Sequence, residues 1–203
     1  MLGVLIEKSL AQPEYYPMTV NAIVASANQK NNRDPLMDLD EHTVFSELEQ
    51  LRQAALVARV LAGPGARADR FKQDVLGHYG WGNRQQAIMA ELLLRGPQTF
   101  NELKTRCARM VVFESGEALQ ICIQSLMDTT PPFVALLPRQ TGQREARYAH
   151  RLYLADESIV VPSDAAVAVP AAAAPAAPRS ALDERLSALE KRVTELENRL
   201  RSS

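Results

Sequence analysis

Several residue types that mark particular protein classes are scarce in this chain of 203 residues. It has two cysteines, Cys107 and Cys122, both in helix-like surroundings, so we expect core residues and no disulfide framework. Its three histidines, His42, His78 and His150, stand far apart, so we expect neither a metal site nor a cofactor. No apolar run reaches the ~20 residues that a membrane span needs, so no membrane partner is expected.

Signatures of catalysis and secretion are absent as well. The chain contains no phosphate-cradling Gly-x-x-x-x-Gly-Lys and no Gly-x-Ser-x-Gly. We therefore expect a non-enzymatic protein without catalytic residues. The first residues form an apolar stretch that is too short for a signal peptide and lacks a basic leader, so a cytoplasmic location is expected.

A basic excess, which is common in dedicated nucleic-acid binders, is also missing. The chain carries 23 Lys and Arg against 24 Asp and Glu, which gives a net charge of -1. Residues 161–203 hold six of each, so residues 1–160 are nearly balanced. Any surface that binds nucleic acid must therefore be local. Hydrophobic residues make up 46% of the chain, which is enough for a buried core.

The C-terminal part divides into a linker and a heptad segment. Residues 162–180 are almost entirely Ala, Pro and Val without any period, so we assign a flexible Ala/Pro-rich linker to residues 156–180. A coiled-coil helix is predicted at residues 181–201. Its apolar seam recurs at spacings of four and three residues and consists of Leu182, Leu186, Leu189, Val193, Leu196 and Leu200.

Charges beside this seam favour a parallel homodimer. Every g position is basic and every e position is acidic, so in a parallel pair Arg185 faces Glu190 and Arg192 faces Glu197. An antiparallel pair would place like charges together. A trimer, or a helix that docks on its own domain, are the alternatives.

A pattern of three helices and a β-hairpin occurs first in residues 1–77. Apolar spacing predicts helices that begin near Leu2, at Thr19 and at a capping box over residues 38–41. Strand-like residues 56–61 and 69–75 follow, with a Gly-Pro-Gly turn between them.

The same pattern recurs about 80 residues on, within residues 83–155. One helix stops at Gly96-Pro97, a second opens at the capping box 99–102, and a third starts at Ser115. A hairpin over residues 133–153 closes the copy. We expect a mainly α fold with small β-hairpins (α+β), built from two tandem winged-helix domains, with the linker and coiled coil behind them.

Five segments resemble the YceH-like family of uncharacterised bacterial proteins. They are Gln12–Asn21, Asn28–Pro35, Leu93–Thr99, Arg106–Met110 and Arg144–His150. The resemblance covers roughly residues 1–153 and implies a tandem winged-helix fold, without implying an activity.

The densest polar cluster lies between the second and third predicted helices of the first copy. It comprises Asn28, Gln29, Lys30, Asn32 and Arg33. Amide and cationic side chains of this kind can contact phosphates or base edges. Asn also suits helix ends and turns, and Pro35 prevents the helix from continuing, so the turn role is the favoured interpretation.

Basic residues gather on the hairpins and are rare on the third helices. The charged residues of the third helices are mainly Asp and Glu. Insertion of a third helix into a DNA groove is therefore disfavoured. The candidate nucleic-acid-binding residues are Arg70, Lys72, Arg139, Arg144, Arg147 and Arg151. Such charges could instead protect hairpin edges from unwanted strand pairing.

The sequence is compatible with three functions. The favoured one is a dimeric DNA-binding or transcription-regulating protein that contacts phosphates through its hairpins. The second is a protein-interaction scaffold that does not bind DNA. The third is a small-ligand sensor that uses the polar cluster.

Overall fold

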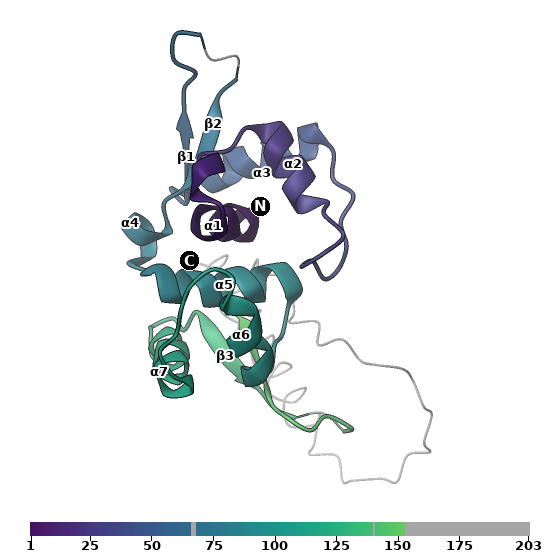
Figure 1. The fold of residues 1–203 in the computed structure, drawn as a ribbon, viewed down its shortest axis with the longest axis vertical. Helices are drawn as coiled ribbons and strands as arrows, with labels where there is room; N and C mark the ends of the chain where they lie inside the picture. Colours follow the sequence, from purple (N-terminus) through teal and green to yellow (C-terminus); the bar gives the residue numbers. More distant parts are fainter. Residues whose placement is uncertain (66–67, 140, 153–203) are drawn as a thin grey trace, which may run out of the picture. The chain divides into compact units, whose positions relative to one another are not determined.

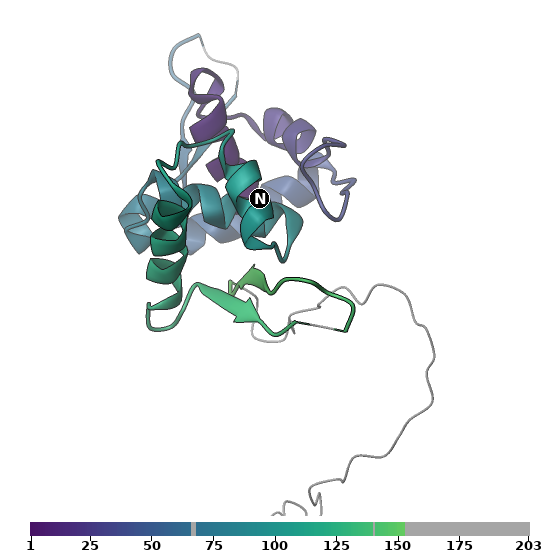
Figure 2. The same ribbon diagram turned by 60° about the horizontal axis from the view of Figure 1, so that its bottom comes forward.

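The computed structural model describes residues 1–65, 68–139 and 141–152. This part of the chain contains seven α-helices, a short 3-10 helix and two antiparallel two-stranded hairpins (Figures 1 and 2). The predicted linker at 156–180 and coiled-coil helix at 181–201, with its apolar seam, lie outside the described residues. None of the described helices combines the length and apolar character needed to cross a membrane.

Three helices followed by a hairpin occur twice, in the predicted order. The first repeat consists of α1 (Leu2–Ala11), α2 (Val20–Ala27), α3 (Glu41–Gln53), β1 (Val57–Val60) and β2 (Arg70–Gln73). The second consists of α5 (Asn83–Arg95), α6 (Phe100–Cys107), α7 (Gly116–Met127), β3 (Val134–Leu137) and β4 (Arg147–His150). The 3-10 helix Pro13–Tyr15 follows α1, and α4 (Val75–Tyr79) lies between the repeats.

The second helix of each repeat begins at a threonine cap. Thr19 Oγ1 accepts a hydrogen bond from the Ala22 N–H at 3.4 Å, and Thr99 Oγ1 accepts one from the Glu102 N–H at 3.2 Å. In the opposite direction, the Glu102 carboxylate accepts a hydrogen bond from the Thr99 N–H at 2.8 Å. The capping box predicted over residues 99–102 is confirmed.

Helix α3 begins two residues later than the sequence predicts. Its cap is Asp40, whose Oδ1 accepts the Thr43 N–H at 2.6 Å. The preceding Leu39 is held outside the helix because its N–H and C=O both bond to the Asn28 side chain at 2.8 Å. The capping box predicted over residues 38–41 is therefore wrong.

Each hairpin is fastened to its own repeat by one further β-bridge. Met18 and Phe71 exchange backbone hydrogen bonds of 3.1 and 2.7 Å in the first repeat. Gln98 and Tyr148 exchange bonds of 2.9 and 2.7 Å in the second. Residues 18 and 98 each precede a threonine cap, so equivalent segments make equivalent contacts in the two repeats.

The first helices of the two repeats, α1 and α5, pack side by side and join the repeats into one core (Figure 1). Leu5 and Ile6 of α1 and Ile88 of α5 have no exposed surface. The approach is close at Gly3, where a Cβ atom would lie 2.9 Å from the Leu93 Cβ. A larger side chain at this position would have to push the helices apart.

A buried ion-pair network crosses this junction. Glu7 of α1 is 1% exposed and pairs with Arg33 at 2.6 Å and with Arg109, which follows α6, at 2.5 Å. Arg109 also pairs at 2.6 Å with Glu91 of α5, which is fully buried. Arg109 thus connects a carboxylate of the first repeat to a carboxylate of the second.

The two cysteines differ in their surroundings. Cys107, at the end of α6, is buried as expected. Cys122 on α7 is only partly buried, so the expectation of a core cysteine holds there only in part. Leu119, Ile123 and Leu126 form the buried stripe of α7, and Cys122 lies at its edge.

Candidate nucleic-acid interface

The hairpin β1–β2 carries two of the predicted cations on its outer face. Phe71 is 1% exposed and points into the core, whereas Arg70 and Lys72 on either side of it are exposed. Arg70 Nη1 donates to the Pro17 carbonyl at 2.8 Å. No described carboxylate pairs with either cation, so both charges are available to an anionic partner.

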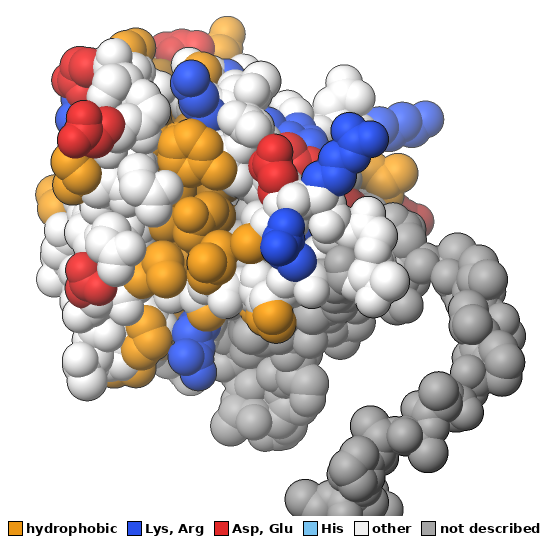
Figure 3. All heavy atoms as spheres, turned by 90° about the horizontal axis from the view of Figure 1, so that it is seen from below, with side chains coloured by type: hydrophobic (Ala, Val, Ile, Leu, Met, Phe, Trp, Pro, Cys, Tyr) orange, Lys and Arg blue, Asp and Glu red, His pale blue; other side chains and the backbone are white. Residues whose placement is uncertain are grey.

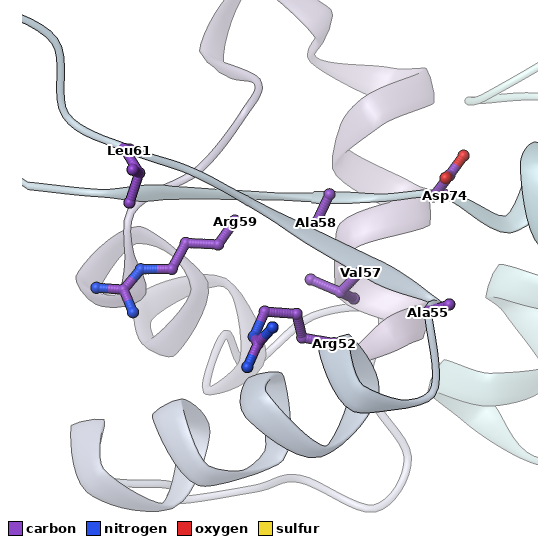
Figure 4. Close-up of a pocket in the computed structure, with 7 residues that line it drawn as sticks. All are labelled: Arg52, Ala55, Val57, Ala58, Arg59, Leu61 and Asp74. Atoms are coloured by element: carbon purple, nitrogen blue, oxygen red, sulfur yellow. The ribbon is translucent and has the colours of Figure 1, made fainter.

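Two further arginines lie beside this hairpin and were not among the predicted residues. Arg52 at the end of α3 and Arg59 on β1 line a pocket of about 590 Å³. Figure 4 shows both guanidinium groups on the side of β1 that faces α3, with Asp74 at the far end. The alternation along β1 could have indicated Arg59, since it brings Arg59 to the same face as the buried Val57.

Both arginines of this pocket already have acidic partners. Arg59 Nε donates to Asp69 Oδ2 at 2.7 Å, and Arg52 Nε donates to Glu49 Oε2 at 2.9 Å. The hydrogen bond from the Ala62 N–H, followed by that from Arg59, lowers the pKa of Asp69 below its ordinary value. Exposed ion pairs of this kind contribute at most about 1 kcal/mol to stability. A phosphate group could therefore replace the carboxylates as the partner of these arginines.

The second hairpin repeats one contact of the first. Arg147, the first residue of β4, donates to the Pro97 carbonyl at 3.0 Å, as Arg70 does to Pro17. Unlike Arg70, it also pairs with Glu102 at 3.1 Å and is half-buried. Arg147 therefore fastens β4 to the capping box of α6, and its charge is partly neutralised.

The remaining cations of the second hairpin are open to solvent. Arg139 and Arg144 flank its turn, and Arg151 follows β4. All three side chains are exposed, and none of the described carboxylates pairs with them. The structure thus leaves five of the six predicted cations, all except Arg147, without an acidic partner among the described residues.

Apart from Arg52, which pairs with Glu49 at the end of α3, the third helices present mainly acidic and uncharged side chains. Glu41 and Glu47 are exposed on α3, and Glu117 is exposed on α7 together with Asp128 at its end. Helix α7 contains no Lys or Arg. These helices would repel DNA phosphates, which leaves the hairpins as the surfaces suited to an anionic polymer.

The polar cluster is largely occupied by internal contacts. Arg33 is buried and, besides Glu7, donates to the backbone carbonyls of Ser26 and Asn32 at 2.7 Å each. The paired bonds between Asn28 and Leu39 shape the turn, as the favoured interpretation predicts.

The other members of the cluster lie around the same turn. Asn32 adopts a left-handed backbone with φ 61° and accepts a hydrogen bond from Arg95, while Gln29 donates to the Asn31 carbonyl at 2.8 Å. Only Lys30 is exposed without a hydrogen bond or an ion pair to the described residues.

Comparison with known proteins places the chain in a family. A family model described as protein of unknown function, DUF480, matches residues 1–143. The chain belongs to the DUF480 family. The match extends from α1 through β3, so it spans the three helices of both repeats.

Relatives of this DUF480 chain carry the name UPF0502 protein. One from Geobacter sulfurreducens is 39% identical over 200 residues, which is 97% of this chain and 86% of the relative. One from Koribacter versatilis is 46% identical over 156 residues, or 77% and 72% of the two chains. One from Mesorhizobium japonicum is 41% identical over 200 residues, or 98% and 91%.

Two buried groups in the second repeat of the DUF480 chain have strongly shifted pKa values. Burial lowers the pKa of His150 to about 4 and raises that of the Cys107 thiol. His42 and His78 are exposed in different parts of the first 80 residues. Among the residues that the structure describes, no three His, Cys, Asp or Glu side chains gather in a way that could hold a metal ion.

Proposed function

We propose that the chain is a dimeric tandem winged-helix protein that binds DNA through its two basic hairpins, in a transcription-regulating role. The order of three helices and a hairpin in each repeat supports the winged-helix assignment. So does the bridge that ties each hairpin to the segment before the second helix. In this assignment, residues 1–77 and 83–155 are the two domains, and the hairpins are their wings.

The observation that carries the proposal is the set of exposed hairpin cations that have no acidic partner in the described part of the chain. They are Arg70, Lys72, Arg139, Arg144 and Arg151. Cations in this state can replace the counterions that surround DNA without first giving up an internal ion pair. The overall charge of -1 is no obstacle, because the positive charge is local.

Wings, rather than third helices, make the contacts in this proposal. A basic hairpin can follow the phosphate backbone or enter a minor groove. The acidic residues of α3 and α7 would then stay away from the phosphates. Binding of this type depends mainly on charge and shape, so we expect modest discrimination between DNA sequences.

Dimerisation follows from the heptad seam of residues 181–201 and doubles the number of hairpin cations. A protein that neutralises about six phosphates has a log–log salt slope of about -5 on duplex DNA. One subunit offers five of these cations, which corresponds to a slope of about -4.5, whereas the ten cations of a dimer correspond to about -9.

Variants with matched charge test the proposal. The triple variant Lys72→Gln, Arg144→Gln, Arg151→Gln removes three hairpin charges without breaking a contact among the described residues. The control Lys8→Gln, Lys30→Gln, Lys104→Gln removes three charges elsewhere. By fluorescence anisotropy on a random duplex, the hairpin variant should bind more weakly, with a salt slope shallower by about 2–3 per subunit. Equal behaviour of the two triple variants would contradict wing contacts.

A second candidate function is a protein-interaction scaffold. On α7, which contains no Lys or Arg, Ile121 is 63% exposed and lines a shallow pocket with Arg84 of α5, and Phe45 on α3 is 39% exposed. Seen from below the view of Figure 1, apolar side chains form a group on one face of the molecule (Figure 3). This candidate predicts a partner that is retained from nuclease-treated lysate by the native chain and lost with Ile121→Asp.

A further inference from the structure

A polar pocket lies at the junction of the two repeats. It has a volume of about 310 Å³ and is formed by the end of α1, the loop of residues 29–32 and Arg109. Because Arg109 follows α6, the wall contains residues of both repeats. The pocket is separate from the hairpin cations that carry the proposed DNA contacts.

Three cations and one carboxylate line this pocket. The cations are Lys8, Lys30 and Arg109, and the carboxylate is that of Glu7. Glu7 is neutralised by its ion pairs with Arg33 and Arg109. Lys8 Nζ donates to the neutral Gln12 side chain at 3.2 Å, and Lys30 is exposed without a described acidic partner. Neither ammonium charge is therefore compensated by a carboxylate of residues 1–65, 68–139 or 141–152.

The buried network behind the pocket also has a positive surplus. Its carboxylates are Glu7 and Glu91, whereas its guanidinium groups belong to Arg33, Arg95 and Arg109. Arg33 Nε is buried without a hydrogen-bond partner. Burial, aided by the charges of neighbouring arginines, lowers the pKa of Arg95 despite its pairing with Glu91.

We propose that this pocket binds a small dianion, of the phosphate-ester or dicarboxylate type, between Lys8, Lys30 and Arg109. Ligand pockets range from ~300 to 1,000 Å³, so this one suits a small molecule better than a nucleotide chain. The amides of Gln29 and Asn31 in the loop add neutral hydrogen-bonding groups to the pocket. They can orient a ligand that the cations attract.

Such a ligand would lie between residues of both repeats. Because it binds the folded chain, it would also raise the temperature of unfolding, in proportion to the logarithm of ligand concentration over Kd. The pocket thereby gives the junction between the two repeats a means to respond to a metabolite.

Calorimetric titration of the full chain tests this inference. Inorganic phosphate and succinate are the two probes, and sodium chloride at matched ionic strength is the monoanion reference. We expect saturable binding of at least one dianion and none of chloride. Tighter binding of phosphate would assign the phosphate-ester class, and tighter binding of succinate the dicarboxylate class.

Two charge-matched variants separate the pocket from general surface charge. Lys8→Gln with Lys30→Gln should weaken binding of the dianion about tenfold or more, a loss of about 1.4 kcal/mol. Lys72→Gln with Lys104→Gln should leave it unchanged. Absence of saturable binding by either dianion, or an equal loss in both variants, would overturn the inference. The DNA affinity of Lys8→Gln with Lys30→Gln tests the proposed function separately, since neither residue lies on a hairpin.

Discussion

Replacement of Arg33 by alanine would remove the main partner of a carboxylate in the core. Arg33 and Glu7 have side chains that are 0% and 1% exposed, and their closest atoms are 2.6 Å apart. The same guanidinium donates to the Ser26 and Asn32 carbonyls at 2.7 Å each. Arg33→Ala would therefore leave one buried charge and two backbone acceptors without this donor.

The expected cost can be bounded from the remaining contacts. Loss of one member of a buried ion pair typically costs about 3–5 kcal/mol. Arg109 stays within 2.5 Å of Glu7 and continues to neutralise it, so we expect the lower end of this range, about 3 kcal/mol. The reference variant Arg52→Ala breaks an exposed pair with Glu49 and should cost at most about 1 kcal/mol.

The assay is urea unfolding of both variants and of the native chain near neutral pH. An unchanged dependence of the free energy of unfolding on urea concentration would show that the transitions are comparable. The double variant Glu7→Gln, Arg33→Met removes both charges and should recover part of the loss. If Arg33→Ala lowered the free energy of unfolding no more than Arg52→Ala does, the view that the buried Arg33–Glu7 pair stabilises the fold would be refuted.

The pH dependence of this loss has a definite sign. Burial acts to raise the pKa of Glu7, but the hydrogen bond and charge of Arg33, with those of Arg109, outweigh it and lower the pKa below 4.5. The resulting stability is fully present above the unfolded pKa and is lost as pH falls through the folded pKa. In Arg33→Ala, Glu7 should become protonated at a higher pH than in the native chain. Acid unfolding of the variant should therefore begin at a higher pH.

Three further predictions concern the junction, the cysteines and the C-terminal segment. Gly3→Val should cost about 1–3 kcal/mol in urea unfolding because its Cβ meets Leu93, whereas Gly116→Ala, with its nearest neighbour at 3.8 Å, should be tolerated. In the native chain, a thiol reagent should modify the partly exposed Cys122 before the buried Cys107, and mass spectrometry of peptides would reveal the reverse order if this is wrong. A chain that ends at residue 180 should sediment as a monomer while the full chain sediments as a dimer; equal masses would contradict the heptad assignment.

Local sequence signals predicted most of the secondary structure. The threonine and serine caps, the Gly-Pro stop after α5 and the alternation in the strands each act over a few residues, so they can be identified in one chain. The late start of α3 could not be predicted, because the bond that holds Leu39 outside the helix comes from Asn28, eleven residues earlier.

The candidate site was predicted less completely. Exposure of Arg70 and Lys72 followed from strand alternation, whereas the anchoring of Arg147 by Glu102 depends on a contact between distant segments. The same limit applies to Arg33, which the sequence places in a polar cluster and the fold buries against Glu7. Long-range pairing of charges decides such cases, and residue type alone does not encode it.

The most direct test of the central proposal is the affinity of the full chain for a random-sequence DNA duplex, measured by fluorescence anisotropy at low and moderate salt. We predict tight binding at low salt that weakens steeply with salt, with a log–log slope of about -9 when both subunits of the dimer contribute. Absence of binding at low salt would contradict DNA recognition by the basic hairpins.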